Sequence, residues 1–272
     1  MESFYKRIAV WKDTENTAPM LSGTGSTKYR WQGYTLTLPS RDSSVCGGGH
    51  YKTTMVSVVN KDLIDVGRDI LMDDAGGDDN PVVLNLADDC FPGGCVSNGS
   101  GAAEESIFRR TNYFRTLTID MYPIQKDEVI YSPSVTVFKE GPAGDFARCT
   151  PFELCFIACP GIRHPCLTDQ GRMKPEDILV LERKIELIFQ VAHKNKHNVL
   201  VLGAMGCGAW KNNPVDVAQA FKRLLVKYDG VFKKVVFAIL QGAEKGYITV
   251  LDSNRLDNFS TFENILCGPG GL

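Results

Sequence analysis

The sequence predicts an α/β fold in which helices cover both faces of a mixed, largely parallel sheet. Apolar, often β-branched runs alternate along the chain with segments whose apolar side chains recur at helical spacing. Several of these runs are continuously apolar, which is typical of strands covered on both faces. Glycine-rich loops directly follow two of the runs, at the position where open α/β sheets bind their ligands.

Six strands are expected, at Met55–Val59, Val82–Leu86, Val129–Phe138, Leu154–Cys159, Val199–Leu202 and Val235–Leu240. One helix is expected to begin at Pro175, and another at Pro214 after an Asn213 cap. A third is expected from about Ala103 to Leu117. Because the Pro214 helix joins the last two strands as a βαβ crossover, these two strands are expected to pair in parallel.

Composition narrows the class of protein. With 272 residues and 43% hydrophobic content, the chain is long enough for a substantial core. Its 30 Lys and Arg balance 32 Asp and Glu, so no bulk positive charge holds nucleic acid, and no direct nucleic-acid partner is expected. Met1–Lys12 lacks the apolar core of a signal peptide, and no later stretch is long enough to span a bilayer, so no membrane partner is expected. The nine cysteines form no CxxC pair, which predicts reduced thiols and a cytoplasmic protein, with access to the nucleus left open.

Two glycine loops carry the functional signal. The first follows the second expected strand, contains Gly93 and Gly94, and leads into a helix that opens with Glu104 and Glu105. The second follows the fifth expected strand and reads Gly-Ala-Met-Gly-Cys-Gly-Ala-Trp. Glycines let main-chain N–H groups converge on an anion such as a pyrophosphate, although neither loop fits the dinucleotide fingerprint or the P-loop. Tight-turn geometry explains either loop alone, whereas the two together favour an anion pocket.

The acidic pair has two interpretations. Acids in the first turn of a helix stabilise it through the macrodipole and need no catalytic role. Carboxylates beside a glycine-lined anion pocket are also well placed to act on a sugar carbon that carries a phosphate. Hydrolysis at an anomeric carbon needs negative charge, a proton for the leaving group and a water, which such acids supply.

Six motifs support a family resemblance: Asn85-Leu86-Ala87, Pro92-Gly93-Gly94-Cys95, Ala103-Glu104-Glu105, Tyr131-Ser132-Pro133, Ala158-Cys159-Pro160 and the second glycine loop at Leu202–Gly208. They resemble, in the same order, motifs of the microbial-type poly(ADP-ribose) glycohydrolases, a branch of the macrodomain superfamily. The matches run from about Arg7 to Ile239, so the likeness covers nearly the whole chain. It implies a macrodomain-like, three-layer α/β/α catalytic domain at residues 46–272, with a helical N-terminal accessory region at residues 1–45 packed on it.

The resemblance also implies an activity and a set of site residues. The expected enzyme is an ADP-ribosyl glycohydrolase, in which Glu105 is the catalytic acid and Glu104 contacts the ribose. The substrate-binding residues expected from the loops are Asn85, Gly93, Gly94, Cys95, Gly206, Cys207, Gly208, Ala209 and Trp210. ADP-ribose or poly(ADP-ribose) and ADP-ribosylated proteins are the expected partners. The resemblance implies no cofactor and no metal.

Several features leave the substrate open. Cys95 stands where the family has a third glycine, which adds bulk and removes glycine's freedom, and Ala103 replaces a glutamine. Asp88 and Asp89, also assigned to the substrate site, are either turn residues or carboxylates that receive a guanidinium leaving group. The alternatives are therefore a mono-ADP-ribosyl-(arginine) hydrolase without activity on chains, and a non-catalytic ADP-ribose-binding module. A cysteine nucleophile at Cys207, paired with one of the four histidines, has no local support beyond the thiol.

Overall fold

The computed structural model describes residues 4–20, 25–31, 51–74, 76–241 and 257–272. Within these ranges the strands are β1 (Thr27–Arg30), β2 (Met55–Val59), β3 (Pro81–Asn85), β4 (Glu128–Lys139), β5 (Arg148–Ala158), β6 (Val199–Leu202) and β7 (Lys234–Ala238). All six expected strands are present, with β5 beginning earlier than predicted. β1 is a strand that the sequence did not indicate.

These strands form one sheet in the order β1-β4-β5-β3-β6-β7-β2. Neighbours from β5 to β2 pair in parallel, whereas β4 pairs antiparallel with both β5 and β1. The predicted mixed, largely parallel sheet is confirmed, as is the parallel pairing of β6 with β7. The carboxyl ends of the parallel strands therefore lie at one edge, and the loops that follow them converge there.

The described helices are α1 (Phe4–Thr17), α2 (Leu63–Asp73), α3 (Ala103–Arg110), α4 (Pro175–Lys194), α5 (Pro214–Lys227) and α6 (Asn258–Leu266). The starts of α4 and α5 are as predicted, and the Asn213 side chain caps α5 by accepting from the N–H groups of Val215 and Asp216. None of the described helices combines the length and the apolar character that crossing a bilayer requires.

The prediction of one helix from Ala103 to Leu117 is wrong. α3 ends at Arg110 because Thr111 adopts an extended backbone and bridges to Val137 of β4. The chain is thereby drawn back to the sheet, and a separate 3-10 turn follows at Tyr113–Arg115. α2 and α6 were not predicted.

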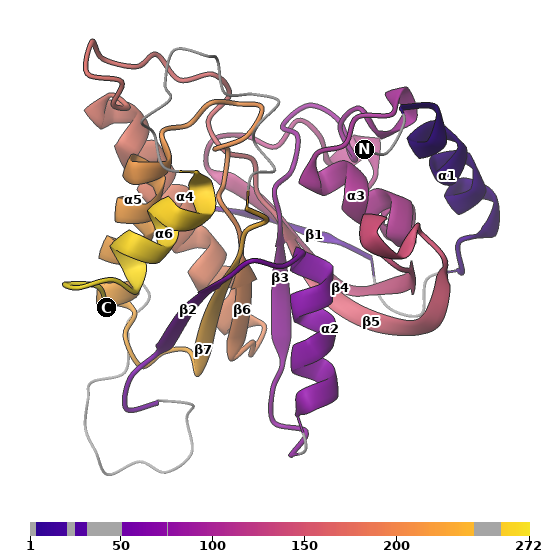
Figure 1. The fold of residues 1–272 in the computed structure, drawn as a ribbon, viewed down its shortest axis with the longest axis horizontal. Helices are drawn as coiled ribbons and strands as arrows, with labels where there is room; N and C mark the ends of the chain where they lie inside the picture. The colour runs from indigo at the N-terminus through magenta and orange to yellow at the C-terminus, as the bar shows by residue number, and fades with distance from the viewer. Residues whose placement is uncertain (1–3, 21–24, 32–50, 75, 242–256) are drawn as a thin grey trace.

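Helices lie on both faces of the sheet, which confirms the layered α/β/α prediction. Figure 1 shows α4, α5 and α6 together on one side of the sheet, and α2, α3 and α1 on the other. Each side has its own apolar core. Phe189, Phe221 and Phe237 belong to the first core, and Trp11 and Phe108 to the second.

The N-terminal segment contributes to both the sheet and a helical layer. α1 packs against α3, and Trp11 of α1 is buried against the rings of Phe108 and Phe114. β1 extends the sheet beside β4. The predicted boundary at residue 45, together with the Ser43–Gly49 stretch, lies outside the described residues, so the division into two regions stays a prediction.

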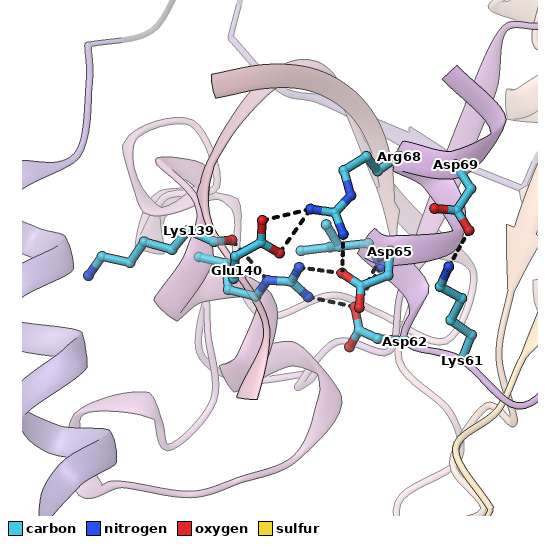
Figure 2. A network of polar contacts seen from close by, with 9 residues as sticks. Lys61, Asp62, Asp65, Arg68, Asp69, Lys139 and Glu140 are labelled. Carbon is cyan, nitrogen blue, oxygen red and sulfur yellow. Dashed lines mark hydrogen bonds and ion pairs between the residues drawn. The ribbon is translucent and has the colours of Figure 1, made fainter. Parts of the chain in front are cut away.

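A buried arginine fixes α3 against its neighbours. Arg110 is 1% exposed, and its guanidinium donates to Asp62 Oδ1 and to Asp65 Oδ1, both at 2.6 Å, and to the Lys139 carbonyl at 3.2 Å. Figure 2 shows the carboxylates of Asp62, Asp65 and Glu140 gathered in this network. Arg110 therefore joins the end of α3 to the start of α2 and to the end of β4.

Replacing Arg110 by methionine should lower the free energy of unfolding by about 3 kcal/mol, because two carboxylates lose a buried partner. Arg223→Met is the matched control: Arg223 pairs with Glu182 at the surface, where its side chain is 49% exposed, and an exposed pair contributes less than about 1 kcal/mol. Urea denaturation followed by circular dichroism measures both values. Equal losses in the two variants would contradict the anchoring role of Arg110.

Candidate active site

A cleft of about 290 Å³ opens at the carboxyl ends of β3, β6 and β7. Four of the predicted binding residues line it, namely Gly206, Gly208, Ala209 and Trp210 of the second glycine loop. The opposite wall comes from the start of α3, through Ala102, Ala103 and Ser106. The structure thus brings the second loop and the acidic helix to one cavity.

Glu104 and Glu105 lie at the first turn of α3 and are 3% and 7% exposed. Glu104 accepts a hydrogen bond from Asn85 Nδ2 at 3.0 Å and one from the Asp88 N–H at 2.7 Å. Glu105 accepts one from the Cys95 N–H at 3.2 Å. Among the described residues, these donors belong to β3 and the first glycine loop, whereas α3 itself supplies none. The acids therefore bind the loop instead of capping their own helix.

Burial changes the protonation of Glu104. Removal from water raises its pKa to about 8, and the neighbouring Glu105 charge adds to this effect. The hydrogen bonds from Asp88 and Asn85 oppose the rise without cancelling it. Two buried phenols share these surroundings: burial raises the pKa of Tyr113 and of Tyr122, and Glu104 raises both further.

The first glycine loop lies directly over the two acids. A Cβ added to Gly94 would lie 3.0 Å from Glu105 Oε1 and 3.4 Å from Glu104 Oε2. Gly93 has a φ of +75°, and a Cβ there would lie 2.5 Å from the ring of Phe108 on α3. Glycine is therefore required at position 93 for both backbone conformation and space.

Arg109, a second buried arginine, binds the first glycine loop. Arg109 is 1% exposed and donates to the Ser100 carbonyl at 2.5 Å, the Val96 carbonyl at 3.3 Å and the Arg7 carbonyl of α1 at 3.1 Å. Arg7 in turn donates to the Gly99 carbonyl at 2.6 Å. Hydrogen bonds from these two arginine side chains to main-chain carbonyls therefore link the first glycine loop, α3 and α1.

The Asp88–Asp89 pair already binds a guanidinium, that of Arg163. Arg163 Nη2 lies 2.7 Å from Asp88 Oδ2, Arg163 Nε lies 3.0 Å from Asp89 Oδ1, and the guanidinium carbon is 4.4 Å from the centre of the Trp210 ring. Partial burial works against ionisation of Asp89, yet Arg163 holds the pKa of that carboxyl below its usual value. Arg163 therefore joins the two glycine loops across the top of the sheet.

Arg163 was not predicted as a site residue. The available signal was its position shortly after the carboxyl end of β5, but the sequence does not show that it reaches Asp88 and Asp89. Ligand atoms of Asp88, Asp89 and Cys90 lie within 4.8 Å of one another, so by distance this group is able to hold a metal ion. Arg163 occupies the two carboxylates of that group, which makes it a poor metal site.

Asn212 shapes the second loop. Its side chain donates to the Ile162 carbonyl at 2.5 Å and accepts from the Ile162 N–H at 3.1 Å. The segment that carries Arg163 is thereby bound to the second loop. Cys207, which was predicted to bind substrate, is 8% exposed, and its thiol donates to the Met205 carbonyl at 3.6 Å. Its side chain supports the loop, so only its main chain is placed to contact a ligand.

Comparison with known proteins adds a family to this geometry. Residues 15–140 match the model of the microbial-type PARG (poly(ADP-ribose) glycohydrolase) catalytic domain. This match spans β3, the first glycine loop and both acids of α3. Over these residues the chain is similar to the microbial-type poly(ADP-ribose) glycohydrolases. The resemblance found in the sequence is therefore confirmed. A comparison with curated proteins finds no match.

Solved bacterial PARG structures share the fold. The enzyme from Thermomonospora curvata is 25% identical, with a TM-score of 0.74 over 96% of this chain and 99% of that one. The same enzyme bound to the inhibitor ADP-HPD gives a TM-score of 0.72 at the same identity and coverage. The PARG from Deinococcus radiodurans in complex with ADP-ribose is 25% identical, with a TM-score of 0.62 over 78% of this chain and 83% of that one.

The two departures from the family motif have small effects on the backbone. Cys95 has a φ of −100°, which any residue adopts, so the freedom of a third glycine is not needed there. Its side chain is exposed, while its N–H still donates to Glu105. Ala103 is half-buried in the wall of the cleft, where a glutamine would supply a polar group that this chain lacks.

The raised pKa of Glu104 makes stability depend on pH. Between the ordinary value of 4.5 and about 8, the folded state keeps a proton that the unfolded chain has lost, so stability falls as pH rises through this window. Glu104→Gln, which carries no titrating group, should flatten the fall. The measurement is the melting temperature from pH 5 to pH 8.5, with the exposed Glu263→Gln as control. A slope in Glu104→Gln as steep as in the unmodified protein would refute the assignment.

The loop geometry predicts a contrast between two glycines. Gly93→Ala should lower the free energy of unfolding by about 2 to 4 kcal/mol, because it combines a left-handed backbone with a clash against Phe108. Gly208→Ala should change it by less than about 0.5 kcal/mol, since a Cβ there has no described atom within 4 Å. Denaturant titration of both variants decides the matter, and similar losses would show that Gly93 is not constrained as described.

Proposed function

We propose that this chain is an ADP-ribosyl glycohydrolase that binds ADP-ribose in the cleft and hydrolyses the glycosidic bond at its anomeric ribose carbon. The observation that carries the proposal is the buried Glu104–Glu105 pair, which is bound by the first glycine loop and lies on α3, the helix whose Ala103 and Ser106 line the cleft. The family match covers this loop and both acids. The two bacterial PARG structures with ADP-ribose or an inhibitor bound share the fold and support the same ligand class.

The residues divide the work of the reaction between them. Cleavage passes through an oxocarbenium-like state that requires nearby negative charge and a proton for the leaving atom. Glu105 donates that proton and then activates the attacking water. Glu104, fixed by Asn85 and the Asp88 N–H, orients the ribose hydroxyls.

The loops supply binding and orientation. Main-chain N–H groups of the two glycine loops hold the diphosphate, and the ring of Trp210 closes one wall of the cleft. Since the cleft walls and the acids are tied together through α3, binding of the diphosphate presents the ribose to Glu105. Much of the rate enhancement then comes from orientation.

The partners and location follow from this function. We propose poly(ADP-ribose) and ADP-ribosylated proteins as substrates, and a cytoplasmic location that rests on the cysteine pattern alone. The alternative is activity restricted to arginine-linked mono-ADP-ribose, for which the one relevant observation is that Asp88 and Asp89 bind a guanidinium, that of Arg163.

Glu105→Gln should lower the hydrolysis rate by about 10² to 10⁴-fold, the usual contribution of general acid–base catalysis, while ADP-ribose still binds in calorimetry. The assay offers radiolabelled poly(ADP-ribose), arginine-linked and glutamate-linked mono-ADP-ribose in parallel and measures released ADP-ribose. Glu263→Gln, which changes an exposed side chain of α6, is the matched control. Binding without release from any of the three substrates would favour a non-catalytic ADP-ribose-binding module.

A further inference from the structure

A second cavity, of about 380 Å³, lies beside the cleft and has no role in the proposed function. Its walls come from the Ile124–Lys126 turn, the Pro160–Cys166 segment and the first turns of α4. Gly161 lines both cavities, and a Cβ added to it would lie 2.7 Å from Gly206 Cα. The Pro160–Cys166 segment therefore lies between the second cavity and the second glycine loop.

Lys184 marks this cavity as a binding site. It is 3% exposed, lies on α4 and lines the cavity. No hydrogen bond or ion pair joins its ammonium to another of the described residues. Removing a charged ammonium from water without a counter-charge is strongly unfavourable, so a buried lysine facing a cavity calls for an anion in that cavity.

The remaining charges of the cavity agree with this requirement. Lys126, Lys174 and Arg163 add positive charge to the walls, against the acids Asp89, Glu176 and Asp177. Asp89 is neutralised by Arg163, and Glu176 is exposed in the first turn of α4. The remaining acid, Asp177, lies two turns before Lys184 on α4 and forms no ion pair with it. Lys184, the least exposed of these groups, therefore keeps its charge without a matching acid on the described walls.

The start of α4 adds little to this attraction. Its first residue, Pro175, has no N–H, and the N–H groups of Asp177 and Ile178 already donate to the Lys174 carbonyl at 3.0 Å. Glu176 and Asp177 also place two negative charges in this first turn. The positive charge of the cavity therefore comes from its lysines.

We infer that this cavity is an anion subsite that takes a phosphate or diphosphate group through Lys184, with the exposed Lys126 and Lys174 also on its walls. Its wall residue Asp89 is bonded to Arg163, and the adjacent Asp88 donates its N–H to Glu104, so the subsite borders the segment that binds this acid. The phosphate could belong to the next unit of a poly(ADP-ribose) chain, an interpretation that rests on the proposed function. In that case the subsite favours poly(ADP-ribose) chains over single ADP-ribose groups as substrates. A free phosphate compound is the other source of the same chemistry.

The test titrates inorganic pyrophosphate into the protein saturated with ADP-ribose, by calorimetry at low ionic strength. One pyrophosphate should bind per chain, and Lys184→Met should weaken that binding at least about tenfold, because a charge-assisted contact is lost. Lys184→Arg should retain it. Lys222→Met is the matched control, since Lys222 lies on α5, donates to the Gly270 carbonyl and borders neither cavity.

Several outcomes overturn the inference: no pyrophosphate binding in the presence of ADP-ribose, equal binding by Lys184→Met, or an equal loss in Lys222→Met. Retained ADP-ribose binding shows that Lys184→Met is folded. If Lys184→Met does not fold, Lys174→Met, which changes an exposed lysine of the cavity, is used to measure the loss of pyrophosphate binding instead.

A KM raised about tenfold for poly(ADP-ribose) alone identifies the poly(ADP-ribose) chain as the source of the phosphate. Lost pyrophosphate binding with unchanged KM identifies a free phosphate compound. Absence of hydrolysis by the unmodified protein would contradict the proposed function and leave the pyrophosphate result standing.

Discussion

Two neighbouring carboxylates are kept out of water at the first turn of α3, and the rest of the site is arranged around the free energy that this costs. A buried carboxylate loses its hydration, and a second one beside it adds repulsion, which is why the pKa of Glu104 rises to about 8. The compensating donors are the Asn85 side chain and the N–H groups of Asp88 and Cys95. All three lie in one stretch of chain, from the end of β3 through the first glycine loop. The loop and the acids therefore stabilise each other and must form together.

The opposite end of α3 explains how so short a helix holds these acids in place. Eight residues are too few for a helix to be stable by itself. Arg109 and Arg110, both 1% exposed, bind its last turn to the glycine loop and α1 on one side and to α2 and β4 on the other. Acids at the start and cations at the end also complement the helix dipole. Because Arg109 donates to the Arg7 carbonyl of α1 and Arg7 donates to the Gly99 carbonyl, the N-terminal helix supports the first glycine loop directly.

The parts of this arrangement that were predictable from sequence are those encoded by local patterns. The runs that became β6 and β7 are continuous and apolar, and the Asn213–Pro214 start of α5 has an explicit cap, so these elements were found. β1 was missed because four residues with an exposed, polar pattern form a strand only through pairing with β4. α3 was predicted too long because its apolar spacing continues past Arg110, whereas its end is set by the bridge from Thr111 to the sheet.

The site shows the same limit. Glu104, Glu105 and the glycines of both loops were identified from motifs. Gly206 and Gly208 line the cleft, whereas Gly94 lies against the two acids on α3 and does not line it. Arg163, Asn212 and Lys184 were not, since their importance arises from contacts with segments far away in the sequence. Arg163 lies 75 residues from Asp88, and nothing in the local sequence of either indicates their contact.

That contact also constrains what the Asp88–Asp89 pair can contribute to substrate choice. An arginine-linked substrate that used these carboxylates would first displace the guanidinium of Arg163. The Arg163 side chain is 41% exposed, so breaking its ion pairs costs only about 1 kcal/mol. The incoming guanidinium would regain a similar amount, so the exchange provides little net affinity. A leaving group that is a neutral hydroxyl, as in a chain, leaves Arg163 in place, bonded to Asp89 and stacked on Trp210. Preference between the two acceptors must therefore depend on how the leaving group lies relative to Arg163, and binding strength at the two aspartates cannot decide it.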